Sequence, residues 1–373
     1  MKKTYIHALA ACAALLPVMN LNAARYAGFE TDAFNRAFPA SYRHDIAFSP
    51  ASFEFDCVVF AEALDTIGRA NMAEKMGVLT DFESVYQPIF AEYAARTNGF
   101  WTVMTRGFVL PNIEKSLPMY RILMRDQYNA AVCQAFPKKG PEMWFRAQMD
   151  GEMEDFEIPN DAALDDRRYS YYDLISVHAE FETSLPYSSR GRFRAIDGKD
   201  VEVDYMSGVQ RADVMETKNF TLIRLPMKGG CEFYVMTPKA DVELGDIRNE
   251  ISSTRIDGLF ATLNAAVDGG VVSHGPVEIS LPKLKFRSRV DFSGVMRYFR
   301  FPLMGLKKAV GDYSSRELIQ CVKFELDGGK ADGSASAPAP AERKFVLDRP
   351  FLFFIHQPST VTTPVAGQFT GVK

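Results

Sequence analysis

Histidine and carboxylate side chains are the groups in this sequence that could carry acid–base or metal chemistry. Carboxylate runs such as 152–155 are typical of solvated helix faces, and the paired glycines at 229–230 follow no phosphate-binding pattern. None of the histidines beyond the N-terminal segment belongs to a zinc-binding helix motif or lies near a Gly-x-Ser-x-Gly nucleophile turn; they are His44, His178, His274 and His356. The sequence therefore predicts no enzyme activity, no metal site and no bound cofactor.

A run of small residues near the end of the chain offers a different chemistry, that of accessible peptide bonds. Residues 328–340 are Gly-Gly-Lys-Ala-Asp-Gly-Ser-Ala-Ser-Ala-Pro-Ala-Pro, a composition that a packed core would not use. By composition alone the run is typical of a linker between two domains. Only about thirty residues follow it, too few for an independent domain. We therefore expect an exposed loop that one body holds at both ends, followed by a strongly apolar strand at 344–355.

The elements that hold this loop change in type along the chain. Helical periodicity dominates from residue 50 to about 155, with a β-rich run at 102–110 that Pro111 closes. Strand patterns follow at 174–181, 200–206, 220–225, 232–237, 277–281 and 283–286, with short helices at 243–267 and 291–299. Because strands and helices do not alternate regularly, the sequence predicts a single α+β domain.

Composition and charge argue against some classes of binding partner. The chain has 373 residues, of which 47% are hydrophobic, so it can bury a large core. Its formal net charge is −4, and it has no cluster of lysine and arginine, which argues against nucleic acid or an anionic membrane as a partner. Basic residues at 190–194 and 283–289 form no convincing anion-binding stripe.

The first residues have the form of a secretory signal peptide, predicted over 1–23, with the domain over 24–373. Two lysines, an apolar run at 8–19 and small residues at 21–24 follow in the expected order, and the run is too short for a membrane span. A lipoprotein box ending at Cys12 comes before the apolar run is finished, so lipid anchoring is the less favoured alternative. We expect a secreted or periplasmic protein, whose remaining cysteines are buried free thiols: Cys57, Cys133, Cys231 and Cys321.

Segments spread over some 320 residues resemble the serpin family, in the family's own order. Phe-Ser-Pro-Ala-Ser at 48–52 resembles the start of its second helix, and Tyr-Asn-Ala-Ala-Val at 128–132 the opening of its large sheet. Trp144, Phe145 and Gly151 resemble the helix that covers this sheet. The most specific segment is Asp-Arg-Pro-Phe-Leu-Phe-Phe-Ile at 348–355, and further matches lie at 222–228, 233–238, 277–285 and 367–369.

This resemblance implies an α+β fold with three β-sheets, about eight or nine helices and an exposed reactive-centre loop at about 328–344. In this family a protease attacks the loop, and the cut loop then inserts as a new central strand of the large sheet while the protease stays acylated. The implied protein is a monomeric, single-use inhibitor of a serine protease, without turnover.

Insertion would bury every second side chain of the loop. The odd-numbered positions are all glycine or alanine and could be buried without clash: Gly329, Ala331, Gly333, Ala335, Ala337 and Ala339. The resemblance implies that the loop hinge consists of Gly328, Gly329, Ala331, Gly333 and Ala335. Pro338 and Pro340 count against insertion, since each lacks a backbone donor in what would become a central strand, at a cost of about 1 kcal/mol or more each.

The hinge and the loop length also depart from the family pattern. Glycines stand at 328–329 where the family prefers acidic residues, and the loop is shorter than usual. Counting forward from the hinge places the scissile bond at Glu342, Arg343 or Lys344, whereas counting back from 350–351 places it near 336–339. Arg343 or Lys344 would suit a trypsin-like protease, whose pocket carries a carboxylate, and Ala337 or Ala339 an elastase-like one. Arg343 is the favoured residue.

The resemblance also implies a hydrogen-bonded shutter cluster where the sheet opens. Ser49 and Ser52 match its two serines. His178 lies where the family usually has asparagine, and Gln320 near where it has histidine. This predicts an exchanged pair that keeps its hydrogen bond, because both groups can donate and accept; alternatively, His178 is an ordinary buried polar residue. The family's tryptophan beneath the hinge is replaced by Leu185 or Pro186.

Two functions follow from these observations. The first is a secreted inhibitor of a trypsin-like or elastase-like protease, which the small odd-numbered face of the loop favours. The second is a non-inhibitory serpin-like binding or structural protein whose loop is only a substrate, which the prolines and the short loop favour. An unrelated secreted hydrolase is the weakest alternative, because no nucleophile–base pair can be named.

Overall fold

The computed structural model describes residues 28–78, 81–95, 99–137, 139–159, 167–329, 341 and 343–372. The predicted signal peptide at 1–23 and most of the predicted loop lie outside these residues.

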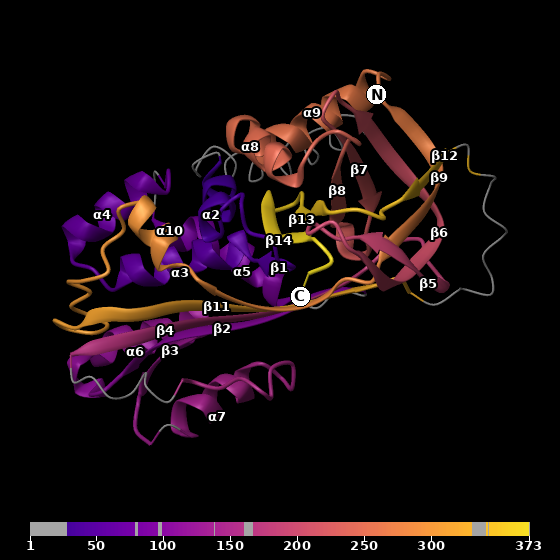
Figure 1. Ribbon diagram of the computed structural model, residues 1–373. Coiled ribbons are helices and arrows are strands. Elements are labelled where there is room, and N and C mark those ends of the chain that lie inside the picture. The colour runs from indigo at the N-terminus through magenta and orange to yellow at the C-terminus, as the bar shows by residue number, and fades with distance from the viewer. Residues whose placement is uncertain are drawn as a thin grey trace, which may run out of the picture.

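A five-stranded sheet forms the long layer at the lower left of Figure 1. Its order is β10 (Lys285–Asp291), β11 (Ser314–Asp327), β4 (Arg168–Glu180), β2 (Phe100–Leu110) and β3 (Ala130–Gln134). β11 and β4 are parallel neighbours from Ser314 opposite Arg168 to Asp327 opposite Glu180, while β10 and β2 run antiparallel to them. The predicted β-rich run at 102–110 is confirmed as the greater part of β2.

The two faces of this sheet are covered differently. Leu318, Gln320, Val322, Phe324 and Leu326 of β11 are buried towards the main core, as period-two alternation requires. On the other face, α7 (Lys139–Gln148) places its apolar side against the sheet (Figure 1), in a cluster that includes Phe145, Tyr172, Leu174 and Ile319. The odd-numbered β11 residues beyond Ile319, towards the loop, are less buried.

The remaining strands form one hydrogen-bonded path that bends at the long strand β6 (Asp200–Glu216). One group contains β1 (Ile46–Phe48), β14 (Thr362–Phe369), β13 (Phe351–Gln357), β8 (Glu232–Pro238) and β7 (Phe220–Pro226). The other contains β5 (Tyr187–Arg194), β9 (Ser273–Pro282) and β12 (Arg343–Val346). Within β6, residues 213–216 pair with β7, and residues 200–207 pair with β5. Together with the five-stranded sheet, these groups give the three sheets that were expected.

Two strand predictions need correction. The predicted strand at 200–206 continues for ten more residues as β6, because its second half joins the neighbouring sheet. The single strand predicted at 344–355 is two strands, β12 and β13, separated by the irregular residues 347–350, where the ring of Pro350 removes a backbone donor.

Nine α-helices lie in the described part of the chain and complete an α+β fold. α3 (Pro50–Glu62) is buried along its whole length, with Ser49 as its N-cap and Pro50 in its first turn. The others are α2 (Phe29–Ala37), α4 (Thr66–Lys75), α5 (Phe82–Ala94), α6 (Pro118–Tyr128), α7, α8 (Leu244–Thr254), α9 (Ile256–Asp268) and α10 (Ser293–Tyr298). Among the described residues, no helix is both long and apolar enough to span a membrane.

The four cysteines expected as free thiols are free in the structure. Cys57 and Cys231 are buried, and Cys133 and Cys321 are partly buried. Burial raises the pKa of each thiol, to about 12 for Cys133 and Cys321, so the reactive thiolate is disfavoured.

Candidate functional site

The predicted loop leaves the body at the end of β11, through two glycines that the local backbone requires. A Cβ on Gly328 would lie 2.8 Å from the carbonyl oxygen of Leu185, and Gly329 has a φ of +73°. The N–H of Leu185 donates to the carbonyl of Gly328 at 2.6 Å, so Leu185 lies beneath the hinge, where the missing tryptophan was expected. The other predicted hinge residues, Ala331, Gly333 and Ala335, lie outside the described residues.

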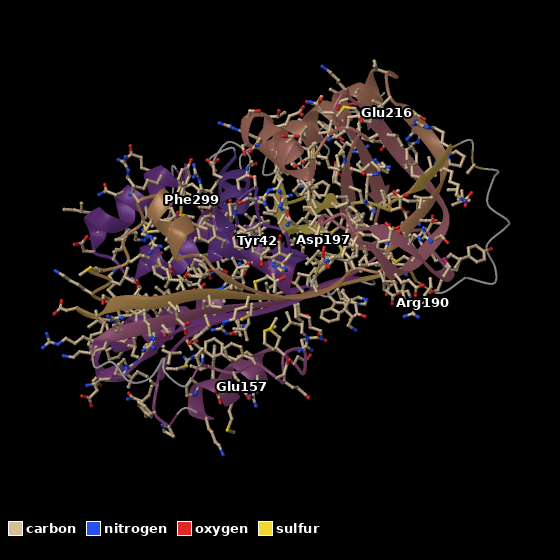
Figure 2. The ribbon with its side chains drawn as sticks, in the orientation of Figure 1. Tyr42, Glu157, Arg190, Asp197, Glu216 and Phe299 are labelled. Carbon is tan, nitrogen blue, oxygen red and sulfur yellow. The ribbon has the colours of Figure 1, made fainter. Side chains whose placement is uncertain are left out.

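The chain returns to the body as β12, which pairs in parallel with β9 at one end of the sheet path. The guanidinium of Arg343 bonds to Glu216 (labelled in Figure 2) and lies 4.9 Å from the ring centre of Phe345. The ammonium of Lys344 lies 2.6 Å from the carboxylate of Glu278. Two of the predicted scissile residues, Arg343 and Lys344, are therefore held in a strand. The others, Ala337, Ala339 and Glu342, lie outside the described residues.

The parallel pair β4/β11 is the place where the sheet could accept another strand. β11 runs directly into the loop, so a loop that turned back would run antiparallel to β11 and, equally, to β4. Such a strand could pair with both neighbours through the regular antiparallel hydrogen-bond pattern. Its entry would break every present hydrogen bond between β4 and β11.

A buried polar cluster lies against the middle of this pair, and we call it the shutter cluster. The side chain of Gln320 accepts from the N–H of Ser49 at 2.7 Å and donates to the carboxylate of Asp173 at 2.9 Å. The hydroxyl of Ser52 also donates to Asp173 at 2.9 Å, while Arg106 donates to that hydroxyl at 2.9 Å. Three of the four predicted shutter residues, Ser49, Ser52 and Gln320, are thus brought together.

A fully buried arginine adds a charge to the shutter cluster. The side chain of Arg106 is 0% exposed and lies 3.4 Å from both Asp56 and Asp173. Burial raises the pKa of Asp56 well above its usual value, and the nearby carboxylate of Asp173 acts in the same direction. Burial therefore favours the neutral form of Asp56, while Arg106 lies within ion-pair distance of both carboxyl groups.

The prediction that His178 pairs with Gln320 is wrong. Gln320 lies opposite Asp173 in the β4/β11 register, and His178 lies opposite Glu325, five residues further along β4. Five is an odd number of strand residues, so the two side chains project from opposite faces of the sheet. Asp173, and not His178, provides the partner of Gln320.

Arg106, Asp56 and Asp173 were missed by the sequence analysis, although each leaves a recognisable signal. Each is a charged residue inside an apolar run: Arg106 within 102–110, Asp56 within 53–60, and Asp173 within 171–177. Charged residues are rarely fully buried unless they are paired. The pattern could have predicted that these three residues need partners, but not that they are one another's partners.

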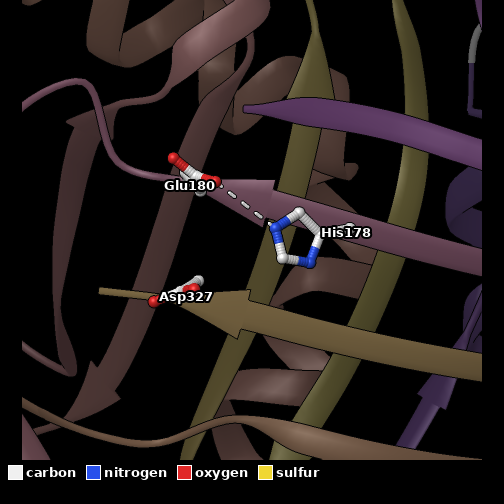
Figure 3. A group of neighbouring side chains, drawn as sticks. All are labelled: His178, Glu180 and Asp327. Atoms are coloured by element: carbon white, nitrogen blue, oxygen red, sulfur yellow. Dashed lines mark ion pairs between the residues drawn. The ribbon is translucent and has the colours of Figure 1, made fainter. Parts of the chain in front are cut away.

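His178 belongs to a second cluster, at the loop end of the same strand pair, which we call the hinge cluster (Figure 3). It contains His178 and Glu180 at the end of β4 and Asp327 at the end of β11. The imidazole Nε2 of His178 lies 3.5 Å from a carboxylate oxygen of Glu180, and the ring stacks on Trp101 with centroids 5.2 Å apart. Lys228 bonds to the other oxygen of Glu180 at 2.6 Å.

The chain is similar to known serpins in sequence and in fold. The family model described as serpin (serine protease inhibitor) matches residues 26–371. An uncharacterized serpin-like protein of Methanosarcina acetivorans is 24% identical over 237 residues, and the probable non-inhibitory serpin-Z5 of Arabidopsis thaliana is 23% identical over 273. These matches cover 58% and 67% of this chain, and 53% and 59% of the relatives' own lengths.

Solved serpin structures superpose over almost the whole chain. Native protease nexin-1, solved with heparin, matches with a TM-score of 0.78 and 16% identity, and the match covers 95% of this chain and 99% of that one. The thermophilic serpin tengpin in its native state matches with a TM-score of 0.73 and 14% identity, over 92% of each chain. Identities this low show a shared fold, and the family model supplies the membership: the chain belongs to the serpin family.

Proposed function

We propose that the protein is an exported, single-use inhibitor of a serine endopeptidase. The observation that carries this proposal is the parallel β4/β11 pair, whose strand β11 continues into the hinge glycines and the loop. A strand inserted between β4 and β11 could run antiparallel to both. The loop that follows β11 is a candidate for this strand, because it begins at the end of the pair where insertion would start. The small odd-numbered face of the loop sequence fits the burial that insertion demands.

The trap works because one chemical step is interrupted. The hydroxyl oxygen of the protease serine bonds to a loop carbonyl carbon, the peptide C–N bond breaks, and the amine leaves with a proton. The upstream part of the loop is then an ester on the protease. Insertion of that segment between β4 and β11 carries the protease away before water hydrolyses the ester.

The arrangement of β12 bears on where the bond is cut. A substrate must enter the protease cleft as an extended segment, but Arg343 is paired to β9 and its side chain is bonded to Glu216. Attack after Arg343 would first require β12 to separate from β9. We therefore favour a bond upstream of β12, within the small-residue run 335–341, and an elastase-like protease as the target. The bonds that directly follow Ala337 and Ala339 lead into Pro338 and Pro340, so they are the less favoured ones in this run.

The proposal is tested by mixing the mature protein with elastase-like and trypsin-like proteases and looking for a covalent complex of summed mass on a denaturing gel. We expect a complex with an elastase-like enzyme, and the mass of the released C-terminal peptide will identify the scissile bond. Release of a peptide that begins at Lys344 would instead show cleavage after Arg343.

A matched pair of variants links trapping to insertion. Ala331→Arg places a charge on the face that must be buried, whereas Asp332→Arg places the same side chain on the other face. We expect the Ala331 variant to be cut without forming a complex and the Asp332 variant to retain trapping. Equal trapping by both variants would contradict the insertion step.

The alternative is a serpin fold used for binding, with a loop that proteases simply cut. The Arabidopsis relative is described as probably non-inhibitory, which favours this alternative. Lys330, which stands where the family prefers glycine, and the two loop prolines also favour it. Clean loop cleavage, with no complex and undiminished protease activity for every protease tested, would establish this alternative and overturn the first.

A further inference from the structure

The hinge cluster brings together one imidazole and two carboxylates. The proposed trapping mechanism gives these three side chains no role. The ligand atoms of His178, Glu180 and Asp327 all lie within 4.8 Å of one another. In the parallel register, Asp327 is directly opposite Glu180, and His178 precedes Glu180 by two residues. All three side chains therefore project from the same face of the sheet.

The spacing suits a small divalent ion. In tetrahedral coordination with bonds of about 2.0–2.2 Å, two ligand atoms lie roughly 3.4 Å apart. The Nε2 of His178 and the Oε1 of Glu180 are already 3.5 Å apart, without an ion between them. A carboxylate oxygen of Asp327 already lies within 4.8 Å of these atoms and supplies the third protein ligand. Three protein ligands with water in the fourth position is a known form of zinc site.

Each of the three side chains is also oriented by a contact on another of its atoms (Figure 3 shows the three groups). The ring of His178 stacks on Trp101 with an interplanar angle of 15°. Glu180 accepts from Lys228 through Oε2, which leaves Oε1 towards His178. Asp327 accepts from the N–H of Gly329 at 2.9 Å. Such outer contacts are typical of metal ligands, because they fix the direction of the lone pairs.

The surrounding charges are nearly balanced. Lys228 opposes a bound cation, but it bonds to Oε2 of Glu180 and leaves Oε1 for the ion. The Lys228 side chain is 37% exposed, so its ammonium can turn to solvent when an ion binds. Glu325, opposite His178, adds a further carboxylate, which forms an ion pair with Lys285 at 3.2 Å.

We propose that His178, Glu180 and Asp327 bind a divalent transition-metal ion, with Zn²⁺ as the representative ion, and that the ion ties the end of β4 to the end of β11. An imidazole with two carboxylates favours this class over Mg²⁺ or Ca²⁺, which prefer oxygen ligands alone.

The position of the ion gives it a role in sheet opening. Asp327 is the last residue of β11, and its carboxylate also holds the hinge through Gly329. A strand entering between β4 and β11 from the loop end must first separate Asp327 from Glu180. The bound ion therefore acts as a latch that favours the closed pair. Binding itself does not depend on the proposed function, whereas the effect on trapping does.

Zinc titration of the uncleaved mature protein by calorimetry, after treatment with a chelator, tests the site. We expect one bound ion per chain. His178→Gln and Asp327→Asn each remove a ligand but keep size and polarity, and we expect affinity to fall by about tenfold or more. His274→Gln is the matched control, because His274 also lies beside a carboxylate, that of Asp213, at 2.5 Å. Absence of binding, or an equal loss in the His274 variant, would overturn the site.

Amide hydrogen exchange, compared with and without Zn²⁺, tests the latch without any protease. We expect slower exchange at 177–180 and 324–327 in the wild-type protein, and no change in the Asp327→Asn variant. Binding without slower exchange would overturn the latch. Because neither measurement requires trapping, failure of the metal site can be told apart from failure of the proposed inhibitory function.

Discussion

The β4/β11 pair carries two polar clusters of opposite character. In the middle, the shutter cluster places Gln320, Asp173 and Arg106 in a site that is fully buried. At the loop end, the hinge cluster leaves His178 and Glu180 partly exposed and Asp327 open to solvent. A desolvated hydrogen bond between Gln320 and Asp173 thus joins the two strands in the middle. At the end, three water-accessible groups only lie near one another, and the ion pair among them, between His178 and Glu180, is within β4.

For the strand insertion that we propose, this difference favours one direction of sheet opening. A buried polar group that loses its partner costs far more than an exposed one, because water cannot replace the lost hydrogen bond. Opening should therefore begin at the hinge cluster, where water is present, and meet its main resistance at the shutter cluster. The variants below measure the two regions against each other.

Arg106→Met should give the largest effect. The substitution leaves the carboxylate of Asp173 buried without its cation, and breaking a buried ion pair in this way typically costs about 3 to 5 kcal/mol. We expect the midpoint of urea unfolding, followed by circular dichroism, to fall accordingly.

Arg192→Met provides the matched control, because Arg192 is 82% exposed and its ion pair with Asp200 is 3.7 Å long. We expect it to change the free energy of unfolding by no more than about 0.5 kcal/mol. Equal losses in the two variants would show that burial does not distinguish the shutter cluster.

The sequence predicted the fold much better than the partners inside it. The motifs at 48–52 and 348–355 located α3 and β13, and Ser49, Ser52 and Gln320 do meet as expected. The partner of Gln320 was misplaced by five residues, because a motif match fixes a strand but not its register. A shift by an odd number also changes the face of the sheet, which is why His178 belongs to the hinge cluster.

Asp56→Asn should have a smaller effect than Arg106→Met at about pH 5, and this effect grows with pH. The pKa of Asp56 is raised in the folded chain, mainly by burial, so this carboxyl stays protonated while its unfolded counterpart, with a pKa of about 3.9, ionises. The free energy of unfolding of the wild-type protein therefore falls as pH rises from the pKa of Asp56 in the unfolded chain to its pKa in the folded chain. Asparagine does not ionise, so the variant lacks this loss.

We expect the Asp56→Asn variant to match the wild-type protein near pH 3 and to become progressively more stable above it. The gain is about 1.4 kcal/mol for each pH unit between the two pKa values. Urea unfolding at several pH values measures it, with Asp204→Asn, at an exposed carboxylate, as the control. A difference that stays constant with pH would mean that Asp56 is ionised in the folded chain.

Lys285→Met should have the smallest effect, since it breaks an ion pair at the hinge-cluster end. Lys285 is 69% exposed, and its partner Glu325, opposite His178, is 40% exposed. Water solvates both groups after the pair is broken, so we expect a change of no more than about 0.5 kcal/mol in urea unfolding. The pair joins β11 to β10, so it measures what an exposed contact at this end contributes and not the β4/β11 contact itself. A loss comparable to that of Arg106→Met would mean that exposed ion pairs stabilise this end of β11 as strongly as buried ones stabilise the middle. The difference in burial would then give no reason for opening to begin at the hinge cluster.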